Sequence, residues 1–400
     1  MQETIKNLVG PDKPVKYVTT FRSVYNPNLF ISQAAFGGQT PGYACATGYS
    51  LNHTILKAVM EGYERSICST PPKEGVIRAR EIDLERKYIC VNPSYYIPLT
   101  KKQLEKCHLK PFSVRRPIFW VKGERYLKDI PFGRSSFFGY ENNDTTVMVP
   151  LDMVYYGFQT RDKLYYANSS GVAAHTDKKK AVELATGELV ERDALMRLWA
   201  SRLPLTEIEL TGPLKKTSAT AEIYGKIGRK LQVFQIPSEY GDVYLATIRG
   251  EEWPAFVCGA SATLDGNHVS AIQKAIEEAE VNFNFYNNMA NREISADLCT
   301  FPELHGLFYC NPRNAKELRF RISEKKAVSE DNEGGHLDKL YHRLNLKMVW
   351  LTKAEDTVKV VRVLSDTLIP ISFGRDMFHY THQRVKGWDG ALGDLPHFFP

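Results

Sequence analysis

Residues 168–200 read NSSGVAAHTDKKKAVELATGELVERDALMRLWA, and the rest of the chain is interpreted around this stretch. A turn of small residues opens it, Thr176 or Asp177 can cap a following helix, and Pro204 lies just beyond its end. These signals predict a helix over residues 178–199. Apolar residues occupy most of its circumference, which predicts a helix buried on most sides.

Three charged residues interrupt this apolar helix. Glu188, Glu191 and Arg192 stand at spacings i, i+3 and i+4, so their side chains project from one face. Burial of an unpaired carboxylate costs several kcal/mol unless cations or hydrogen bonds compensate it. The pattern therefore indicates a ligand at this face, and a metal ion bound together with phosphate would account for it.

The same order of charges occurs a second time. A helix predicted over residues 52–68 carries KAVMEGYER, in which Lys57, Glu61, Glu64 and Arg65 form one stripe at i, i+4, i+7 and i+8. The Glu-x-x-Glu-Arg order of the central helix is thus repeated on a separate helix.

A third predicted helix, residues 268–288, reads HVSAIQKAIEEAEVNFNFYNN. Its Ala-x-x-Glu order matches that of the other two helices and aligns Glu278 with the first glutamate of their Glu-x-x-Glu-Arg motifs. Gln273 and Glu277 offer a competing register, so the sequence leaves the choice between Glu277 and Glu278 open.

Several carboxylates gathered in one space would repel each other unless divalent cations lie among them. Mg²⁺ fits best, because it prefers carboxylates with phosphate oxygens and the motifs contain no His or Cys. Arg65 and Arg192 would then face the phosphates, and Ser170, in a turn before the helix, could receive a phosphate or form a plain turn. A single such motif is more often an exposed ion pair, so the prediction of a magnesium–nucleotide site depends on the repetition.

Composition predicts a soluble α/β protein with a large core: 43% of the 400 residues are hydrophobic and 12% are aromatic. No run approaches the roughly 18 apolar residues of a membrane span, and the N-terminus lacks a signal sequence. Seven cysteines without a CxxC pair predict reduced thiols in the cytoplasm and no zinc site. A net charge of +6 does not require nucleic acid, and the basic tract over residues 101–128 is interpreted mainly as a solubility feature.

The remaining segments predict short strands and loops over residues 1–40, a sheet over 76–163 and a helix over 218–231. An exposed loop or helix start is expected over residues 325–338. MVWLTK and TVKVVRVLS predict a hairpin, and the closing PHFFP is expected to pack against the molecule.

The motifs together resemble the YcaO superfamily, specifically the stand-alone cyclodehydratase subunits that install azoline rings in thiazole/oxazole-modified microcins. The matching segments are KAVMEGYER, the run from NSSGVAAHT to AVELATGELVERDA, AIQKAIEEA and the terminal PHFFP. The chain departs from the family's usual sequence at three places. Serine is common at the position of Lys57, Gly-Lys-Gly at Gly48-Tyr49-Ser50, and proline at Phe398.

The resemblance implies a YcaO-like α/β fold of mixed sheets flanked by helices, with three glutamate-bearing helices around an Mg–ATP site. It implies that the magnesium ligands are Glu61, Glu64, Glu188, Glu191 and either Glu277 or Glu278. The implied nucleotide-binding residues are Lys57, Arg65, Ser170, Arg192 and Gln273. Pro396 and Pro400 of the tail are implied to act at the active site.

The implied function is ATP-dependent conversion of Cys, Ser or Thr in a precursor peptide to thiazoline or oxazoline, by phosphorylation of the backbone amide oxygen. The implied partners are that peptide, an E1-like leader-binding protein and an FMN-dependent azoline dehydrogenase, with no nucleic acid and no membrane. We expect a segment over residues 1–40 to pack on a catalytic domain over 41–400. A thioamide- or amidine-forming enzyme, or a non-catalytic nucleotide-binding subunit, is the alternative.

Overall fold

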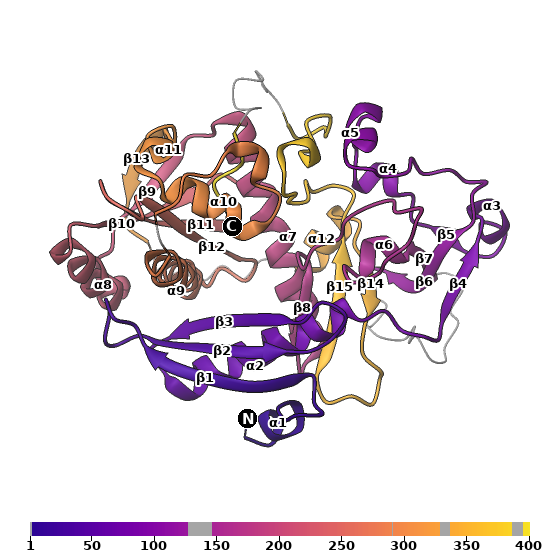
Figure 1. Cartoon of the computed structure of the whole chain (residues 1–400), viewed down its shortest axis with the longest axis horizontal. Coiled ribbons are helices and arrows are strands. Elements are labelled where there is room, and N and C mark those ends of the chain that lie inside the picture. The colour runs from indigo at the N-terminus through magenta and orange to yellow at the C-terminus, as the bar shows by residue number, and fades with distance from the viewer. Residues whose placement is uncertain (1, 127–145, 290, 329–336, 386–394) are drawn as a thin grey trace.

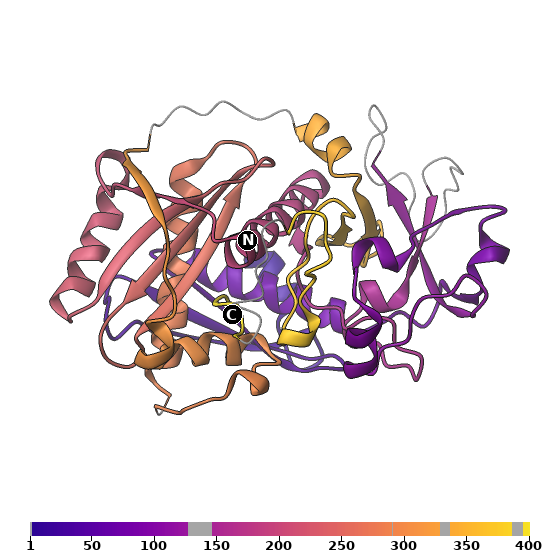
Figure 2. The same ribbon diagram turned by 90° about the horizontal axis from the view of Figure 1, so that it is seen from above.

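The computed structural model describes residues 2–126, 146–289, 291–328, 337–385 and 395–400, which form three β-sheets with helices packed around them (Figures 1 and 2). Helix α7 (Lys178–Ser201) runs through the middle of the molecule between the sheets. Asp177 caps it by accepting the Lys180 N–H, as the sequence predicts. The structure confirms the predicted α/β class with mixed sheets flanked by helices.

The first sheet is an antiparallel meander of β1 (Val15–Arg22), β2 (Phe30–Phe36) and β3 (Gly42–Gly48). Helix α2 (Leu51–Ser69) packs on one of its faces, where the absence of a side chain at Gly62 lets the helix approach Ala34 closely. The expected boundary at residue 40 lies between β2 and β3 of this one sheet, and the division of the chain there stays a prediction.

Two strands of the second sheet are buried on both faces. The order of this sheet is β12-β11-β10-β9-β13, with only β13 and β9 parallel. Along β11, Val243 and Leu245 pack with α7, whereas Tyr244 and Ala246 pack with α9. The strands are β9 (Leu205–Ile208), β10 (Lys230–Ile236), β11 (Asp242–Arg249), β12 (Phe256–Thr263) and β13 (Ile322–Lys326), and α9 is His268–Asn287.

Edge strand β12 lies very close to α9. A Cβ at Gly259 would stand 2.4 Å from the Ala279 nitrogen, so only glycine permits this approach. Two backbone groups of this edge strand are bonded to α9 side chains: the Ala260 N–H donates to Glu278, and Asn282 donates to the Cys258 carbonyl. Glu278 is thereby placed at the edge of the sheet, beside α7.

The third sheet has seven strands in the order β5-β7-β6-β14-β15-β8, with β4 paired to β6. The predicted hairpin is confirmed as the antiparallel pair of β14 and β15. The strands are β4 (Val76–Ala79), β5 (Ile89–Cys90), β6 (Ile118–Arg125), β7 (Thr146–Pro150), β8 (Val172–His175), β14 (Lys347–Trp350) and β15 (Lys359–Leu364).

Three predictions from local pattern were wrong. Helix α1 (Gln2–Leu8) lies where only strands and loops were expected. Helix α8 (Lys215–Lys226) ends before Leu231, because Gly228 turns the chain with φ +71° and Leu231 then pairs with Ile248 in the sheet. Strand β13 replaces part of the expected loop, and its fully exposed residues carry no apolar alternation that could have revealed it. Residues 337–338 of the same prediction are in helix α12 (Leu337–Arg343), as the helix-start alternative expects. Residues 329–336 lie outside the described residues, as does the end of the basic tract at 127–128.

The remaining helices are short and lie around the sheets. They are α3 (Glu81–Leu84), α4 (Pro93–Tyr96), α5 (Lys101–Lys106), α6 (Leu151–Val154), α10 (Pro302–Cys310), α11 (Pro312–Ala315) and α12 (Leu337–Arg343), with 3₁₀ turns at Gly212–Leu214, Ala296–Leu298 and Arg375–Met377. Throughout the described ranges, no helix combines the length and the apolar character needed to cross a membrane.

The closing pentapeptide is built into the core, as expected from its apolar rings. Phe398 and Phe399 are 1% and 0% exposed, and the Phe398 ring contacts Trp199 of α7 edge-on. The Tyr309 hydroxyl donates to the Pro396 carbonyl at 2.7 Å, and His305 Nδ1 lies 2.9 Å from the His397 carbonyl. These contacts hold the end of the chain beside α7.

Candidate functional site

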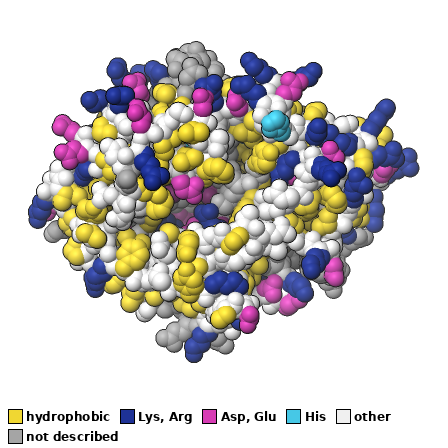
Figure 3. Space-filling view, in the orientation of Figure 1, with side chains coloured by type: hydrophobic (Ala, Val, Ile, Leu, Met, Phe, Trp, Pro, Cys, Tyr) yellow, Lys and Arg dark blue, Asp and Glu magenta, His cyan; other side chains and the backbone are white. Residues whose placement is uncertain are grey.

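A cleft of about 990 Å³ opens between the first sheet, α2, α7 and α9. Figure 3 shows it as a hollow with acidic and basic side chains at its base and apolar side chains around it. The predicted site residues in its wall are Lys57, Glu61, Arg65, Ser170, Glu188, Arg192, Glu277, Glu278 and Pro400. Glu64, Glu191, Gln273 and Pro396 are not part of the wall.

Helix α2 contributes the charged stripe. Arg65 Nε donates to Glu61 Oε1 at 3.0 Å, so these two side chains form an ion pair facing the cleft. Glu64 is half-buried, and burial together with the charge of Glu188 raises the pKa of its carboxyl well above the ordinary value. A carboxylate at Glu64 is therefore costly until a cation lies nearby.

Helix α7 contributes the second group of charges. Glu188 accepts the Gly171 N–H at 2.8 Å and a hydrogen bond from Arg192 at 3.2 Å. Arg192 Nη1 lies 2.7 Å from Glu191, whose side chain is nearly enclosed. Burial, with the charges of Glu278 and Glu188, raises the pKa of Glu191 to about 8.

The two adjacent glutamates of α9 have different surroundings. Glu277 forms an ion pair of 2.6 Å with Lys57 and accepts a hydrogen bond from Gln273 at 3.1 Å. Among the described residues no cation forms an ion pair with Glu278, although the charge of Arg192 acts on it; burial, with the charges of Glu188 and Glu61, raises its pKa to about 7. Glu278 therefore belongs to the cluster of mutually repelling carboxylates, whereas the negative charge of Glu277 is compensated by Lys57.

Of the two alternatives predicted at Ser170, phosphate binding or a plain turn, the structure has a turn. Strand β8, rather than the helix, follows it directly, and the Ser170 N–H already donates to Asn168 Oδ1 at 3.0 Å. Phosphate binding by free backbone N–H groups at a helix start is thus not available here. Ser170 still lines the cleft, so contact through its hydroxyl stays a prediction.

Arg362, which the sequence analysis did not single out, holds this turn in place. It is 2% exposed and donates to the backbone carbonyls of Asn168, Ser170 and Val154. The only available signal was one arginine within the apolar strand KVVRVL, a pattern that indicates a buried cation with several acceptors. Sequence alone does not say which carbonyls those are.

The residues present fit a magnesium–phosphate ligand better than an isolated metal ion. In the parts of the chain that the structure describes, no three acidic, histidine or cysteine side chains form a ready cage for a metal. Mg²⁺ bound with a nucleotide needs only one or two carboxylates per ion, since phosphate oxygens and water complete its shell. Glu61, Glu188 and Glu278 repel each other in one cleft with Arg65 and Arg192, and cations bridged by phosphates would relieve that repulsion.

The tail completes the charged end of the cleft. The Phe399 ring lies 4.4 Å from the Arg192 guanidinium carbon, in cation–π geometry, and Pro400 forms part of the cleft wall. The last residue of the chain is thus in the same cavity as Glu61, Glu188 and Glu278.

Comparison with known proteins agrees with this arrangement. Residues 46–368 match the family model of the YcaO cyclodehydratases, described as ATP- and Mg²⁺-binding. The chain therefore belongs to the YcaO family, as the motifs predict, and the predicted cofactors ATP and Mg²⁺ are those of the family. No curated protein is a significant sequence match to the chain.

Solved structures share the fold at low sequence identity. A heterocyclase in complex with substrate and cofactor has a TM-score of 0.70 and 16% identity; the match covers 98% of this chain but only 55% of the heterocyclase. YcaO from Methanopyrus kandleri bound with AMPPCP and Mg²⁺ has a TM-score of 0.63, 17% identity and coverage of 94% and 89%. The E. coli microcin synthetase McbBCD complex with pro-MccB17 bound has a TM-score of 0.65, 13% identity and coverage of 96% of both chains.

Proposed function

We propose that this chain is an ATP-dependent cyclodehydratase that converts Cys, Ser or Thr of a ribosomally made precursor peptide to thiazoline or oxazoline. One observation carries the proposal: three helices each place a glutamate, Glu61, Glu188 and Glu278, in a single cleft that also contains Arg192 and Pro400. Membership of the YcaO family supports it.

In the proposed reaction the Cys, Ser or Thr side chain attacks the carbonyl carbon of the preceding amide. This attack closes the ring, with the side chain giving up its proton and the amide oxygen taking the negative charge. Mg–ATP, when bound, would supply a phosphoryl group for that oxygen, which would leave as phosphate while the nitrogen loses its proton and the C=N bond forms. Glu61, Glu188 and Glu278 would hold the Mg²⁺ ions, with Glu64 and Glu191 adding negative charge behind them. Arg65 and Arg192 would orient the phosphates, since each lines the cleft and is held there by an ion pair with a glutamate.

The tail would act on the peptide side of this site. Pro400 is held at the cleft wall because Phe398 and Phe399 are buried in the core and the Phe399 ring lies against Arg192. Pro400 at this position would help to exclude water from the reacting amide. Lys57 is better explained as the partner of Glu277 than as a phosphate ligand, because the two form a 2.6 Å ion pair.

The proposed partners are the precursor peptide, an E1-like protein that captures its leader and an FMN-dependent dehydrogenase that oxidises azoline to azole. Two of the structural relatives support a peptide-modifying assembly: one is described with substrate, the other as the McbBCD complex with pro-MccB17. In this proposal residues 41–400 form the catalytic domain.

The direct test combines the purified chain, the E1-like partner and a candidate peptide with ATP and Mg²⁺. We expect the peptide to lose one water per ring, and Glu188→Gln to abolish this loss while the protein stays folded. A product that gains sulfur would instead establish a thioamide-forming enzyme. Equal Mg-dependent ATP binding by wild type and Glu191→Gln, without any product, would establish a non-catalytic subunit.

A further inference from the structure

One face of the first sheet points into the cleft. The register aligns Phe21 of β1 with Ile31 of β2 and Thr47 of β3, two residues further Thr19 with Gln33 and Cys45, and at the far end Tyr17 with Ala35 and Tyr43. The cleft-lining residues of this sheet with the same side-chain direction are Phe21, Ile31, Gln33, Tyr43, Cys45 and Thr47. The opposite face, which includes Ala34, packs on α2.

Aromatic rings are exposed along this face. Phe21 and Tyr43 are 48% and 61% exposed, and Phe285 of α9, which lines the same cleft, is 40% exposed. Because Ala35 between them is small, the hydroxyls of Tyr17 and Tyr43 meet above it at 3.0 Å and hold the two rings in place. Exposed, fixed rings in a concave surface are typical of a ligand-binding wall.

Amide side chains of α9 accompany the rings. Asn282 and Asn288 line the cleft next to Phe285 and Met289, and their amide groups already donate to backbone carbonyls at 2.8 and 2.9 Å. Their orientation is therefore set, with the side-chain oxygen left to accept. Such a surface suits an extended peptide, because the rings can contact the peptide's side chains and the amides can bond its backbone groups.

Strand β3 connects this wall to the charged base of the cleft. The Thr47 hydroxyl donates to the Glu277 carbonyl at 2.7 Å, and the charge of Glu61 acts on Cys45. From Thr47 to Tyr43 the strand spans about 13 Å, the length of about four residues of extended chain. If the reacting residue of a peptide lay at the base of the cleft, the residues next to it in the peptide would extend along these rings.

We propose that the cleft-facing side of β1–β3, with Phe285, binds about four uncharged residues next to the residue that is cyclised, with aromatic or other apolar side chains preferred. This inference rests on the proposed function and adds the chemical class of the flanking residues. Acidic flanks would be disfavoured, because Glu61 and Glu278 lie at the end of the same wall.

The experiment measures binding of a short fluorescent peptide, with one Cys between apolar residues, to the chain with its partner protein and Mg–AMPPCP. Tyr43→Ala and Phe285→Ala should each weaken peptide binding about tenfold, whereas the affinity for Mg–AMPPCP stays at the wild-type value. Phe285→Leu keeps apolar area and should recover most of the loss. Tyr95→Ala, a matched control at a ring that is 70% exposed but outside the cleft lining, should change neither affinity.

The outcomes separate this inference from the proposed function. Wild-type peptide binding that Tyr43→Ala, Phe285→Ala and Tyr95→Ala all leave unchanged would overturn the peptide wall but leave the cyclodehydratase proposal standing. No peptide binding or modification by wild type would overturn both. Replacing the apolar neighbours of the Cys with Glu should reduce wild-type binding, and equal binding of the two peptides would refute the charge preference.

Discussion

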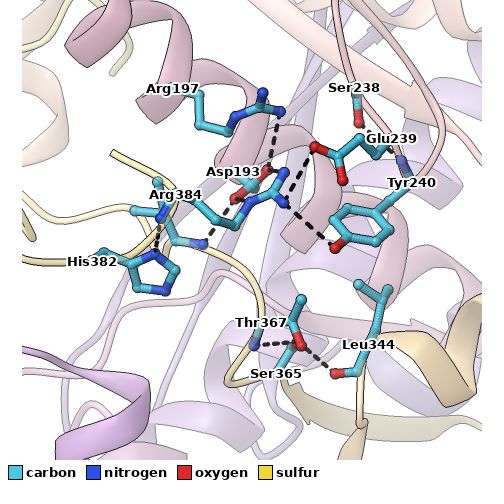
Figure 4. A network of polar contacts seen from close by, with 11 residues as sticks. Asp193, Arg197, Ser238, Glu239, Tyr240, Leu344, Ser365, Thr367, His382 and Arg384 are labelled. Atoms are coloured by element: carbon cyan, nitrogen blue, oxygen red, sulfur yellow. Dashed lines mark hydrogen bonds and ion pairs between the residues drawn. The ribbon is translucent and has the colours of Figure 1, made fainter. Parts of the chain in front are cut away.

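Asp193 of α7 and Arg384 are joined by two hydrogen bonds of 2.8 and 2.9 Å, although 191 positions separate them in the sequence (Figure 4). Asp193 is fully buried, and it also accepts the Ile369 N–H at 3.0 Å. Arg384 lies over the Tyr240 ring at 4.9 Å. Arg192 lines the cleft, whereas Asp193, the next residue of α7, binds the C-terminal segment.

Removing the cation of this pair should destabilise the protein strongly. Arg384→Met leaves the buried Asp193 carboxylate without its main partner, which costs about 3–5 kcal/mol of the free energy of unfolding. Arg384→Lys keeps the charge but loses the two-pronged geometry, so its loss should be intermediate. Urea unfolding measures both.

The exposed pair Arg313–Glu293, 3.2 Å apart with both side chains mostly in solvent, provides the control. Arg313→Met should not change the unfolding midpoint measurably, because water replaces such a contact. If Arg384→Met behaved like Arg313→Met, the buried pair would have no structural importance.

Glu278→Gln should weaken nucleotide binding and yet stabilise the free protein. Glutamine retains the hydrogen bond from the Ala260 N–H but removes the repulsion from Glu188 and Glu61. We expect a higher melting temperature without ligand, and an affinity for Mg–ATP lower by about 10–100-fold, since a charged ligand to the cation is lost. Calorimetric titration and thermal unfolding measure the two effects.

Glu277→Gln is the matched comparison, because Glu277 is one residue away and paired with Lys57. Its effect on Mg dependence should be smaller than that of Glu278→Gln. The reverse order would assign Glu277, rather than Glu278, to the cation site.

The stability of the protein should depend on pH through His305. Its ring is buried between the His397 carbonyl and the Gly374 N–H, and burial lowers its pKa to about 4. The folded state therefore favours neutral His305, and its contribution to stability is fully present above the unfolded pKa of about 6.5 and is lost as the pH falls toward 4. At pH 5 this loss is about 2 kcal/mol.

Unfolding measured at about pH 7 and pH 5 checks this prediction. His305→Asn can keep the hydrogen bond to the His397 carbonyl without a titrating ring, so its stability should change less between the two pH values than that of wild type. His53→Asn, at an exposed histidine, should retain the wild-type difference. An unchanged difference in His305→Asn would place the pH dependence elsewhere.

Extending the chain beyond Pro400 should stop ring formation. Phe398 and Phe399 are buried and Pro400 lines the cleft, so residues added after Pro400 would begin beside the charged side chains of the cleft. We expect even a short tag to abolish product while ATP binding remains mostly intact; the same tag placed before α1 is the control. Full activity of the C-terminally tagged protein would contradict a role for the terminus at the active site.

Much of this architecture could be predicted because helical features are local. The cap at Asp177, the spacing of Glu188, Glu191 and Arg192, and the repeat of that spacing on α2 all lie within short stretches of chain. The hairpin of β14 and β15 was likewise predicted from two adjacent apolar runs. By contrast, β13 has only exposed residues, so nothing in its own composition marks it as a strand.

The sequence alone was sufficient to establish the α/β class, the three glutamate-bearing helices and membership of the YcaO family, since each depends on residue order within single elements. Only the folded chain decided which glutamate of α9 is neutralised, where Arg384 is bound, and that Phe21, Tyr43 and Phe285 share one cleft. These relationships join residues far apart in the chain, and they depend on sheet register and helix packing, which no local pattern encodes.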